Sequence, residues 1–303
     1  MANILERQPL RELNWWKVGG EAEFFALPRT IDELREAYVW AGARGLPVHV
    51  LSAGSNVLLP DGVLKGLVIS VHALVGVEKI ETVDGHVQIV ALAGTPKSDL
   101  AKYFLQNKLA PAIFLTGIPG DVGAGVVMNA GIGESRTPRE FCEIVSEVEV
   151  LRPPVEGRCD LVRVPASQIR WEYRRSTGWQ PGIIVRVVVR WPAVADVEVM
   201  TAVREQTRKR VSTQPLDLPN CGSVFRNPLG HKAAQLIQGA GLKGFRVGGA
   251  AVSTKHANFI VNDQGATSAD ILAVIDHVRS EVFKQSGVQL ETEVVRLGVE
   301  SGH

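Results

Sequence analysis

The chain has 303 residues and little cysteine, few aromatic residues and no excess of either charge. Its three cysteines, Cys142, Cys159 and Cys221, are an odd number at wide spacing. Neither a disulfide framework nor a zinc site fits that pattern, so we expect a reducing cytoplasm and no bound metal. The formal net charge is only +1. A broad basic face is therefore absent, and we expect no nucleic-acid partner.

Long apolar runs are also missing. A membrane-spanning helix needs ~20 apolar residues, whereas the run Ile183–Val189 has the length of a strand and contains Arg186. Residues 1–16 carry several charges and no continuous apolar stretch, so we expect neither a secretory signal nor a membrane partner. Hydrophobic residues still make up 45% of the chain, which excludes intrinsic disorder.

The pattern of apolar residues predicts a chain of mixed helices and strands. Its length suggests two domains. The pattern of residues changes between residues 192 and 210, which predicts a domain boundary there, with a larger α+β region before it and a smaller α/β region after it. Thr30 and Glu33 form a capping box ahead of a helix that should end at Gly45. Further expected elements are the strands His86–Leu92, Val145–Leu151 and Val288–Leu297, and the helix Ser268–Gly287.

Glycine is plentiful, and its densest cluster is the most unusual segment. Four glycines and one alanine fall within the nine residues Gly117–Gly125, and the segment continues to Asn129 and Gly131. Backbone N–H groups left unshielded by side chains can wrap a phosphate or lie against a flat ring. A tight turn into a buried helix is the plain alternative. No Gly-Lys-Ser/Thr follows, and no strand–GxGxxG–helix unit is present, so neither a Walker A loop nor a Rossmann fingerprint is expected.

Other segments carry polar groups suited to binding or catalysis. Ala53-Gly54-Ser55-Asn56 lies between two apolar strands, where it is either a phosphate-binding turn or an ordinary one. Arg174 follows Tyr173 and suits bidentate recognition of a carboxylate or phosphate, although a surface arginine is equally expected. Ser223 is not part of a GxSxG elbow, so a serine hydrolase is not indicated.

The last strand and the segment before it add two candidates. Glu291 and Glu293 are two residues apart on the expected strand and so share a face. Such a pair is usually solvated, but a partly buried glutamate with raised proton affinity fits this apolar strand. His256 reads as a capping or surface group.

Taken in order, these segments resemble the UDP-N-acetylenolpyruvoylglucosamine reductase family, also called the MurB family. The resemblance spans residues 14 to 298, and the short form of His256–Asn262 is similar to the second subtype. The matching motifs are Asn14 with Val18-Gly19-Gly20, Gly54-Ser55-Asn56, Gly117-Ile118-Pro119-Gly120 through Asn129-Ala130-Gly131, Tyr173-Arg174 with Ser176, Gly222-Ser223-Val224-Phe225 to Asn227-Pro228, Ala240-Gly241-Leu242-Lys243-Gly244, His256–Asn262 and Leu290-Glu291-Thr292-Glu293-Val294.

The resemblance implies a fold and a reaction. The fold is α+β, a vanillyl-alcohol-oxidase (PCMH-type) FAD-binding fold over residues 1–200, in two α+β subdomains split near residue 72, with a smaller C-terminal α/β substrate domain over 201–303. FAD would be bound tightly but not covalently, NADPH would be the hydride donor, and the substrate would be a small UDP-sugar. The product, UDP-N-acetylmuramate, would serve peptidoglycan synthesis, and with it cell-wall biogenesis, cell shape and cell division, in the cytoplasm. No oligomer is implied.

The resemblance also assigns roles to residues. Arg174 and Glu293 would stabilise the enolate-like intermediate, with Glu293 protonated, and Ser223 would donate the proton. The residues expected to bind FAD are Ala53, Gly54, Ser55, Asn56, Gly117, Ile118, Pro119, Gly120, Gly123, Ala124, Asn129 and Gly131. The residues expected to bind the substrate are Tyr173, Arg226, Asn227 and His256.

Three departures from the family pattern concern binding segments. Thr213 stands where many members carry lysine, so either Lys209 or Arg210 replaces that lysine or its contact is lost. Trp15 follows Asn14 in place of threonine, and Ser52-Ala53 replaces two glycines. Two alternatives to the reductase stay open: an oxidase on the same flavin fold, and a nucleotide- or sugar-binding regulator that has lost activity. A binding domain without flavin is a third.

Overall fold

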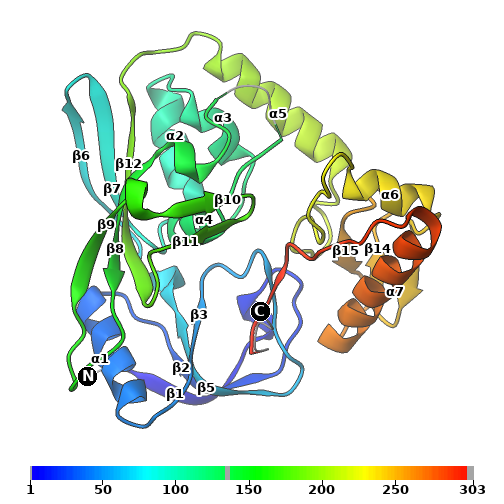
Figure 1. Ribbon diagram of the computed structural model, residues 1–303, viewed down its shortest axis with the longest axis horizontal. Helices are drawn as coiled ribbons and strands as arrows, with labels where there is room; N and C mark the ends of the chain where they lie inside the picture. Colours follow the sequence, from blue (N-terminus) through cyan, green and yellow to red (C-terminus); the bar gives the residue numbers. More distant parts are fainter. Residues whose placement is uncertain (1, 134–136, 299–303) are drawn as a thin grey trace. The chain divides into compact units, whose positions relative to one another are not determined.

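The computed structural model describes residues 2–133 and 137–298 and forms two compact units, each discontinuous in sequence (Figure 1). The first unit consists of Met1–Leu5, Phe24–Ala53 and Gly66–Lys209. The second consists of Glu6–Glu23, Gly54–Lys65 and Arg210–His303. The domain division into 1–200 and 201–303 stays a prediction. Among the described residues, no helix has the length and apolar character that crossing a bilayer requires, and no cluster of three or more His, Cys, Asp or Glu residues suits a metal ion.

A five-stranded antiparallel sheet forms the centre of the first unit. Its order is β6 (Val77–Val83), β7 (His86–Leu92), β12 (Ile183–Pro192), β8 (Val145–Leu151) and β9 (Leu161–Pro165). Helices α2 (Lys97–Gln106), α3 (Pro111–Thr116) and α4 (Val122–Val127) cover one face of this sheet (Figure 1). Apolar residues that alternate along β7, β8 and β12 face these helices, because successive side chains of a strand point to opposite faces. Phe104, Phe114 and Phe141 are fully buried in the resulting core.

A second sheet and helix α1 (Ile31–Gly42) enclose another core, whose buried residues belong to the first unit. The sheet order is β1 (Ile4–Pro9), β2 (Glu21–Ala26), β5 (Val63–Ser70) and β3 (Val48–Leu51), with β3 and β5 parallel. Thr30 Oγ1 accepts from Glu33 N at 3.1 Å as expected, but the Glu33 carboxylate accepts from Arg29 N at 2.7 Å rather than closing a full capping box. The remaining elements of this part of the chain are the 3-10 helices η2 (Val71–Ala73), η3 (Phe141–Glu143) and η4 (Ala166–Gln168), the hairpin β10 (Arg170–Glu172) and β11 (Arg175–Thr177), and helix α5 (Val199–Thr213).

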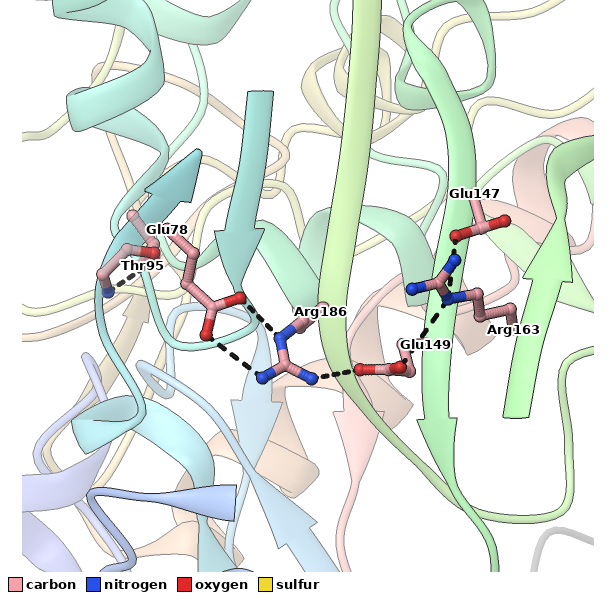
Figure 2. Close-up of polar contacts among 7 residues, drawn as sticks. Glu78, Thr95, Glu147, Glu149, Arg163 and Arg186 are labelled. Atoms are coloured by element: carbon pink, nitrogen blue, oxygen red, sulfur yellow. Dashed lines mark hydrogen bonds and ion pairs between the residues drawn. The ribbon is translucent and has the colours of Figure 1, made fainter. Parts of the chain in front are cut away.

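A network of ion pairs crosses the five-stranded sheet (Figure 2). Arg186 on β12 donates from Nε to Glu78 of β6 at 2.5 Å and from Nη1 to Glu149 of β8. Arg163 on β9 continues the network, with its Nε 3.8 Å from Glu147. The guanidinium of Arg186 thus connects three strands through two carboxylates, and hydrogen bonding to Glu78 is the largest cause of its raised pKa.

The second unit packs a small sheet on a long helix. Strands β13 (Arg246–Val247), β14 (Ala250–Val252) and β15 (Ile260–Asn262) are antiparallel, and α7 (Ser268–Ser286) lies against them. Helix α7 begins with a Thr267–Asp270 capping box and ends at Gly287, whose φ of 70° suits glycine. Helix α6 (Ala233–Gly239), the 3-10 helix η1 (Arg11–Leu13) and a parallel pair of short strands, β4 (Val57–Leu58) and β16 (Val295–Arg296), complete the unit.

The closing strand differs from the expectation. We predicted one strand over Val288–Leu297, but only Val295–Arg296 forms a named strand, while Thr292 makes an isolated bridge with Phe225. The segment divides its pairing between two partners, because residues 291–293 lie beside residues 224–226 and residues 295–296 lie beside β4. A continuous ladder with one partner is therefore not formed.

Candidate functional site

The glycine-rich segment begins at the end of one short helix and passes through a turn into a second. Gly117 is the C-cap of α3, and α4 begins at Val122. Between them Gly120 has a φ of 86°, a conformation that glycine adopts at low cost. The segment therefore has the geometry of the plain alternative, a tight turn into a buried helix, and its role as a ligand-binding loop stays a prediction.

Several of its glycines are required by packing of the chain on itself. A Cβ on Gly125 would lie 2.3 Å from the Phe141 ring, and one on Gly123 would lie 2.7 Å from the Cβ of Ala93. A Cβ on Gly131 would lie 2.3 Å from the Arg139 carbonyl oxygen. These contacts explain the small residues without a ligand, so their assignment to FAD binding stays a prediction.

The surface that the segment offers nevertheless suits an anionic, flat cofactor. Its one acid between Gly117 and Gly133 is Asp121, which is 1% exposed and accepts hydrogen bonds from Ser52 and His72. The segment itself therefore presents no exposed carboxylate to a pyrophosphate. Ile118, Pro119 and Ala124 are half-buried and apolar, as a flat ring requires. These residues fit FAD.

The second expected FAD segment lies at a change of unit. Ala53 ends one part of the first unit, and Gly54, with a φ of 67°, begins a part of the second. A Cβ on Gly54 would lie 2.1 Å from the Leu13 carbonyl oxygen, so only glycine fits. Asn56 donates from Nδ2 to the Glu293 carbonyl oxygen at 3.1 Å, while Ser55 is half-buried.

Arg174 lies in the first unit and contacts the end of the glycine-rich segment. It occupies the turn of the β10–β11 hairpin with a φ of 58°, and its Nη2 donates to the Gly131 carbonyl oxygen at 2.8 Å. Its Nη1 is 3.6 Å from the Glu140 carboxylate, and its guanidinium lies 4.8 Å from the ring centroid of Tyr173. Asn129 donates to Glu140 at 3.0 Å. The structure thus brings Arg174 close to Asn129 and Gly131, which lie more than forty residues before it in the sequence.

Ser223 and Glu293 come together in the second unit. Glu293 N donates to the carbonyl oxygen of Val224 at 2.7 Å, and Arg226 N donates to that of Glu291 at 2.9 Å. The strand-like segments around Ser223 and Glu293 therefore run side by side. Gly222 N donates to Asn220 Oδ1 at 3.0 Å and Val224 N donates to the Asn258 carbonyl oxygen at 2.9 Å, so the backbone is fixed on both sides of Ser223.

The expected substrate-binding residues are more scattered. Arg226 is half-buried, with Nη1 3.9 Å from Glu291 and a buried Nε that makes no hydrogen bond among the described residues. Asn227 is exposed and accepts from Ala233 N at 3.1 Å, at the start of α6. His256 accepts on Nδ1 from Asn258 N at 3.3 Å, and burial, followed by the charge of Lys243, lowers its pKa. Tyr173 is exposed in the first unit.

Two residues that we did not predict organise the site. Asn258 exchanges hydrogen bonds with Phe225, accepting from its N at 3.0 Å and donating to its O at 2.8 Å. Glu140 links Asn129 to Arg174. Asn258 stands in a motif that the sequence already singled out, whereas no local pattern distinguishes Glu140 from other surface acids.

Comparison with known proteins accounts for nearly the whole chain. Residues 22–155 match the FAD binding domain, and residues 214–297 match the UDP-N-acetylenolpyruvoylglucosamine reductase C-terminal domain. A UDP-N-acetylenolpyruvoylglucosamine reductase from a Synechococcus strain is 40% identical over 98% of this chain and 94% of its own length. The enzyme of the same name from Moorella thermoacetica is 38% identical over 96% of this chain and 92% of its own.

A solved structure agrees with these sequences. The crystal structure of UDP-N-acetylenolpyruvylglucosamine reductase (MurB) from Thermus caldophilus aligns with a TM-score of 0.75 at 29% identity, covering 98% of both chains. The expected fold class, an FAD-binding fold with a C-terminal domain, is confirmed. With relatives of this identity matched along almost its full length, the chain belongs to the UDP-N-acetylenolpyruvoylglucosamine reductase family.

Proposed function

We propose that this chain reduces UDP-N-acetylenolpyruvoylglucosamine to UDP-N-acetylmuramate, using tightly and non-covalently bound FAD and NADPH, in the cytoplasmic synthesis of peptidoglycan precursors. Family membership supports the reaction. The observation that carries the residue roles is the hydrogen bond from Glu293 N to the carbonyl oxygen of Val224, which joins the Ser223 and Glu293 segments. A contribution to cell shape and division would follow from the product.

Bound FAD supplies hydride transfer from NADPH to the enolpyruvyl double bond, and the chain's own residues handle the charge and the proton. Hydride addition to one alkene carbon builds negative charge on the substrate carboxylate. Arg174 suits stabilisation of that charge because a hairpin turn and the Gly131 carbonyl oxygen hold its guanidinium. Glu293 assists in its protonated form, as a hydrogen-bond donor.

Ser223 then donates its hydroxyl proton to the other alkene carbon, which completes reduction of the double bond. Its fixed backbone supports that role, because a general acid must be held within hydrogen-bond reach of the carbon that it protonates. Tyr173, Arg226, Asn227 and His256 are the candidate contacts for the UDP-sugar. A neutral imidazole at His256, favoured by its lowered pKa, would bind as a hydrogen-bonding group rather than as a cation.

The decisive experiment follows the flavin spectrum of the purified protein. We expect a yellow protein that NADPH bleaches without oxygen and that UDP-N-acetylenolpyruvoylglucosamine re-oxidises. Acid denaturation should release free FAD. A colourless protein that takes up no FAD would contradict the proposal, and re-oxidation by oxygen alone, with no response to the UDP-sugar, would favour an oxidase.

A further inference from the structure

Asp121 joins two segments that are far apart in the sequence. Its Oδ2 accepts from Ser52 Oγ at 2.7 Å and lies 2.8 Å from His72 Nδ1. Ser52 directly precedes the expected FAD segment 53–56, and Asp121 lies inside the expected FAD segment 117–131. All three residues belong to the first unit. A single buried carboxylate oxygen thus ties the start of one cofactor segment to the turn of the other.

Helix capping does not account for this carboxylate. Asp121 is the N-cap residue of α4, where an aspartate normally accepts from the first helical N–H groups, yet its side chain makes no such bond. Carbonyl oxygens accept from these N–H groups instead: Val122 N donates to Thr95 O at 2.9 Å and Gly123 N donates to Ala93 O at 2.8 Å. The carboxylate is therefore available to hold Ser52 and His72.

Lys97 holds the same turn from the interior. Its ammonium group is buried and donates to the Pro119 carbonyl oxygen at 2.7 Å, while its backbone N donates to Gly120 O at 3.0 Å. Asp121 supplies the opposite charge that favours this buried ammonium. Burying two charged groups is costly unless they are compensated. The Lys97 ammonium and the Asp121 carboxylate are both buried at the 117–121 turn, so we infer that the conformation of this turn is fixed.

We propose that Asp121 is a positioning residue for FAD, which fixes the 117–121 turn and the Ser52–Ala53 end of the neighbouring segment in the arrangement that binds the cofactor. This inference rests on the proposed flavin function. Asp121 contacts neither the substrate nor the reacting atoms. Its contribution is to remove, before binding, the freedom of two segments that would otherwise be ordered at the expense of affinity.

The test measures FAD affinity of the full-length chain, with the recovery of free flavin fluorescence on dilution of the holoprotein as readout. Because hydrogen bonds to a charged group are lost, we expect Asp121→Ala to weaken FAD binding about 10- to 100-fold. Asp121→Asn keeps a side-chain oxygen that can accept from Ser52 and should restore part of the affinity. Asp99→Asn, an exposed acid on α2, is the matched control and should bind as the unaltered protein does.

Ser52→Ala removes the hydroxyl that donates to Asp121, and it serves as the test of the inference if Asp121→Ala does not fold. We expect it to weaken FAD binding several-fold and to have little further effect when combined with Asp121→Ala. Unchanged FAD affinity in Asp121→Ala, or in Ser52→Ala where the first variant is unfolded, would overturn the inference. Failure of the unaltered protein to bind FAD would instead contradict the proposed function itself.

Discussion

At the residue scale, the proton donation that we propose for Ser223 distinguishes the two halves of the reaction. Ser223→Ala should leave reduction of the flavin by NADPH intact, because that half needs no proton from the serine. Re-oxidation by the UDP-sugar should slow by about 10²- to 10⁴-fold, the usual contribution of a general acid. Anaerobic stopped-flow absorbance measures each half separately.

A matched serine controls for a general effect of the substitution. Ser280 is exposed on α7, so Ser280→Ala should change neither half-reaction. Equal loss of both halves in Ser223→Ala would remove the serine from the role of proton donor.

The buried ammonium of Lys97 gives a prediction for stability against pH. Burial lowers its pKa from 10.5 to about 8. Between these values the unfolded chain keeps a proton that the folded chain has released, so the free energy of unfolding rises with pH. Relative to Lys97→Met, the unaltered protein should gain on the order of 3 kcal/mol from pH 7 to pH 10.5.

Urea unfolding of both proteins at several pH values measures this difference. Titrations of all other groups cancel in the comparison to first order. A difference that stays flat, or that falls as the pH rises, would show that Lys97 keeps an ordinary pKa.

At the scale of elements, α4 packs on η3 through a position that admits no side chain. A Cβ on Gly125 would lie 2.3 Å from the ring of Phe141, which is fully buried. Gly125→Ala should therefore destabilise the chain by roughly 1–3 kcal/mol, the typical cost of overpacking a core. Thermal and urea unfolding of the full-length chain measure it.

Gly239, at the end of α6, offers the contrasting case. A Cβ there would meet nothing within 4 Å, so Gly239→Ala should be neutral or stabilise by up to about 1 kcal/mol. If Gly125→Ala were as well tolerated as Gly239→Ala, the packing explanation for the glycine-rich segment would be wrong.

Elements whose signals are local could be predicted from the sequence, whereas those that depend on distant partners could not. The helix Ser268–Ser286 has its own capping box and a terminal glycine, and its predicted bounds agree with the structure to within one residue. The strand predicted over Val288–Leu297 failed because its partners are Phe225 and β4, far along the chain. For the same reason, only family resemblance connected Ser223 with Glu293, since no local pattern shows that their backbones meet.

At the scale of the whole molecule, the second unit depends on residues from three parts of the chain. Trp16 is fully buried, and its Nε1 donates to the Ile260 carbonyl oxygen at 2.7 Å. Asp61 accepts from Ser268 N at 2.8 Å and Ala269 N at 2.9 Å, at the beginning of α7. A C-terminal fragment alone therefore lacks both a core side chain and the Asp61 carboxylate that accepts from the first N–H groups of α7.

The fragment 201–303 should accordingly show no cooperative thermal unfolding when followed by circular dichroism. Trp16→Ala in the full-length chain should destabilise it by about 3–5 kcal/mol, since a large buried side chain leaves a cavity. A sharp unfolding transition in the fragment would contradict this expectation and support 201–303 as an independent domain.

The dispersed origin of the second unit also affects its synthesis. Trp16, Val18 and Leu58 share a core with Leu290 and Val294, so on the ribosome they cannot be covered by these partners until residues 290–294 have been synthesised. At ~5–20 residues per second, that wait is roughly 15 to 55 seconds. During this time the nascent chain exposes the apolar side chain of Trp16, a feature that chaperones bind. Ser223, the proposed proton donor, lies beside the Glu293 segment and so reaches its final surroundings only after that segment has been synthesised.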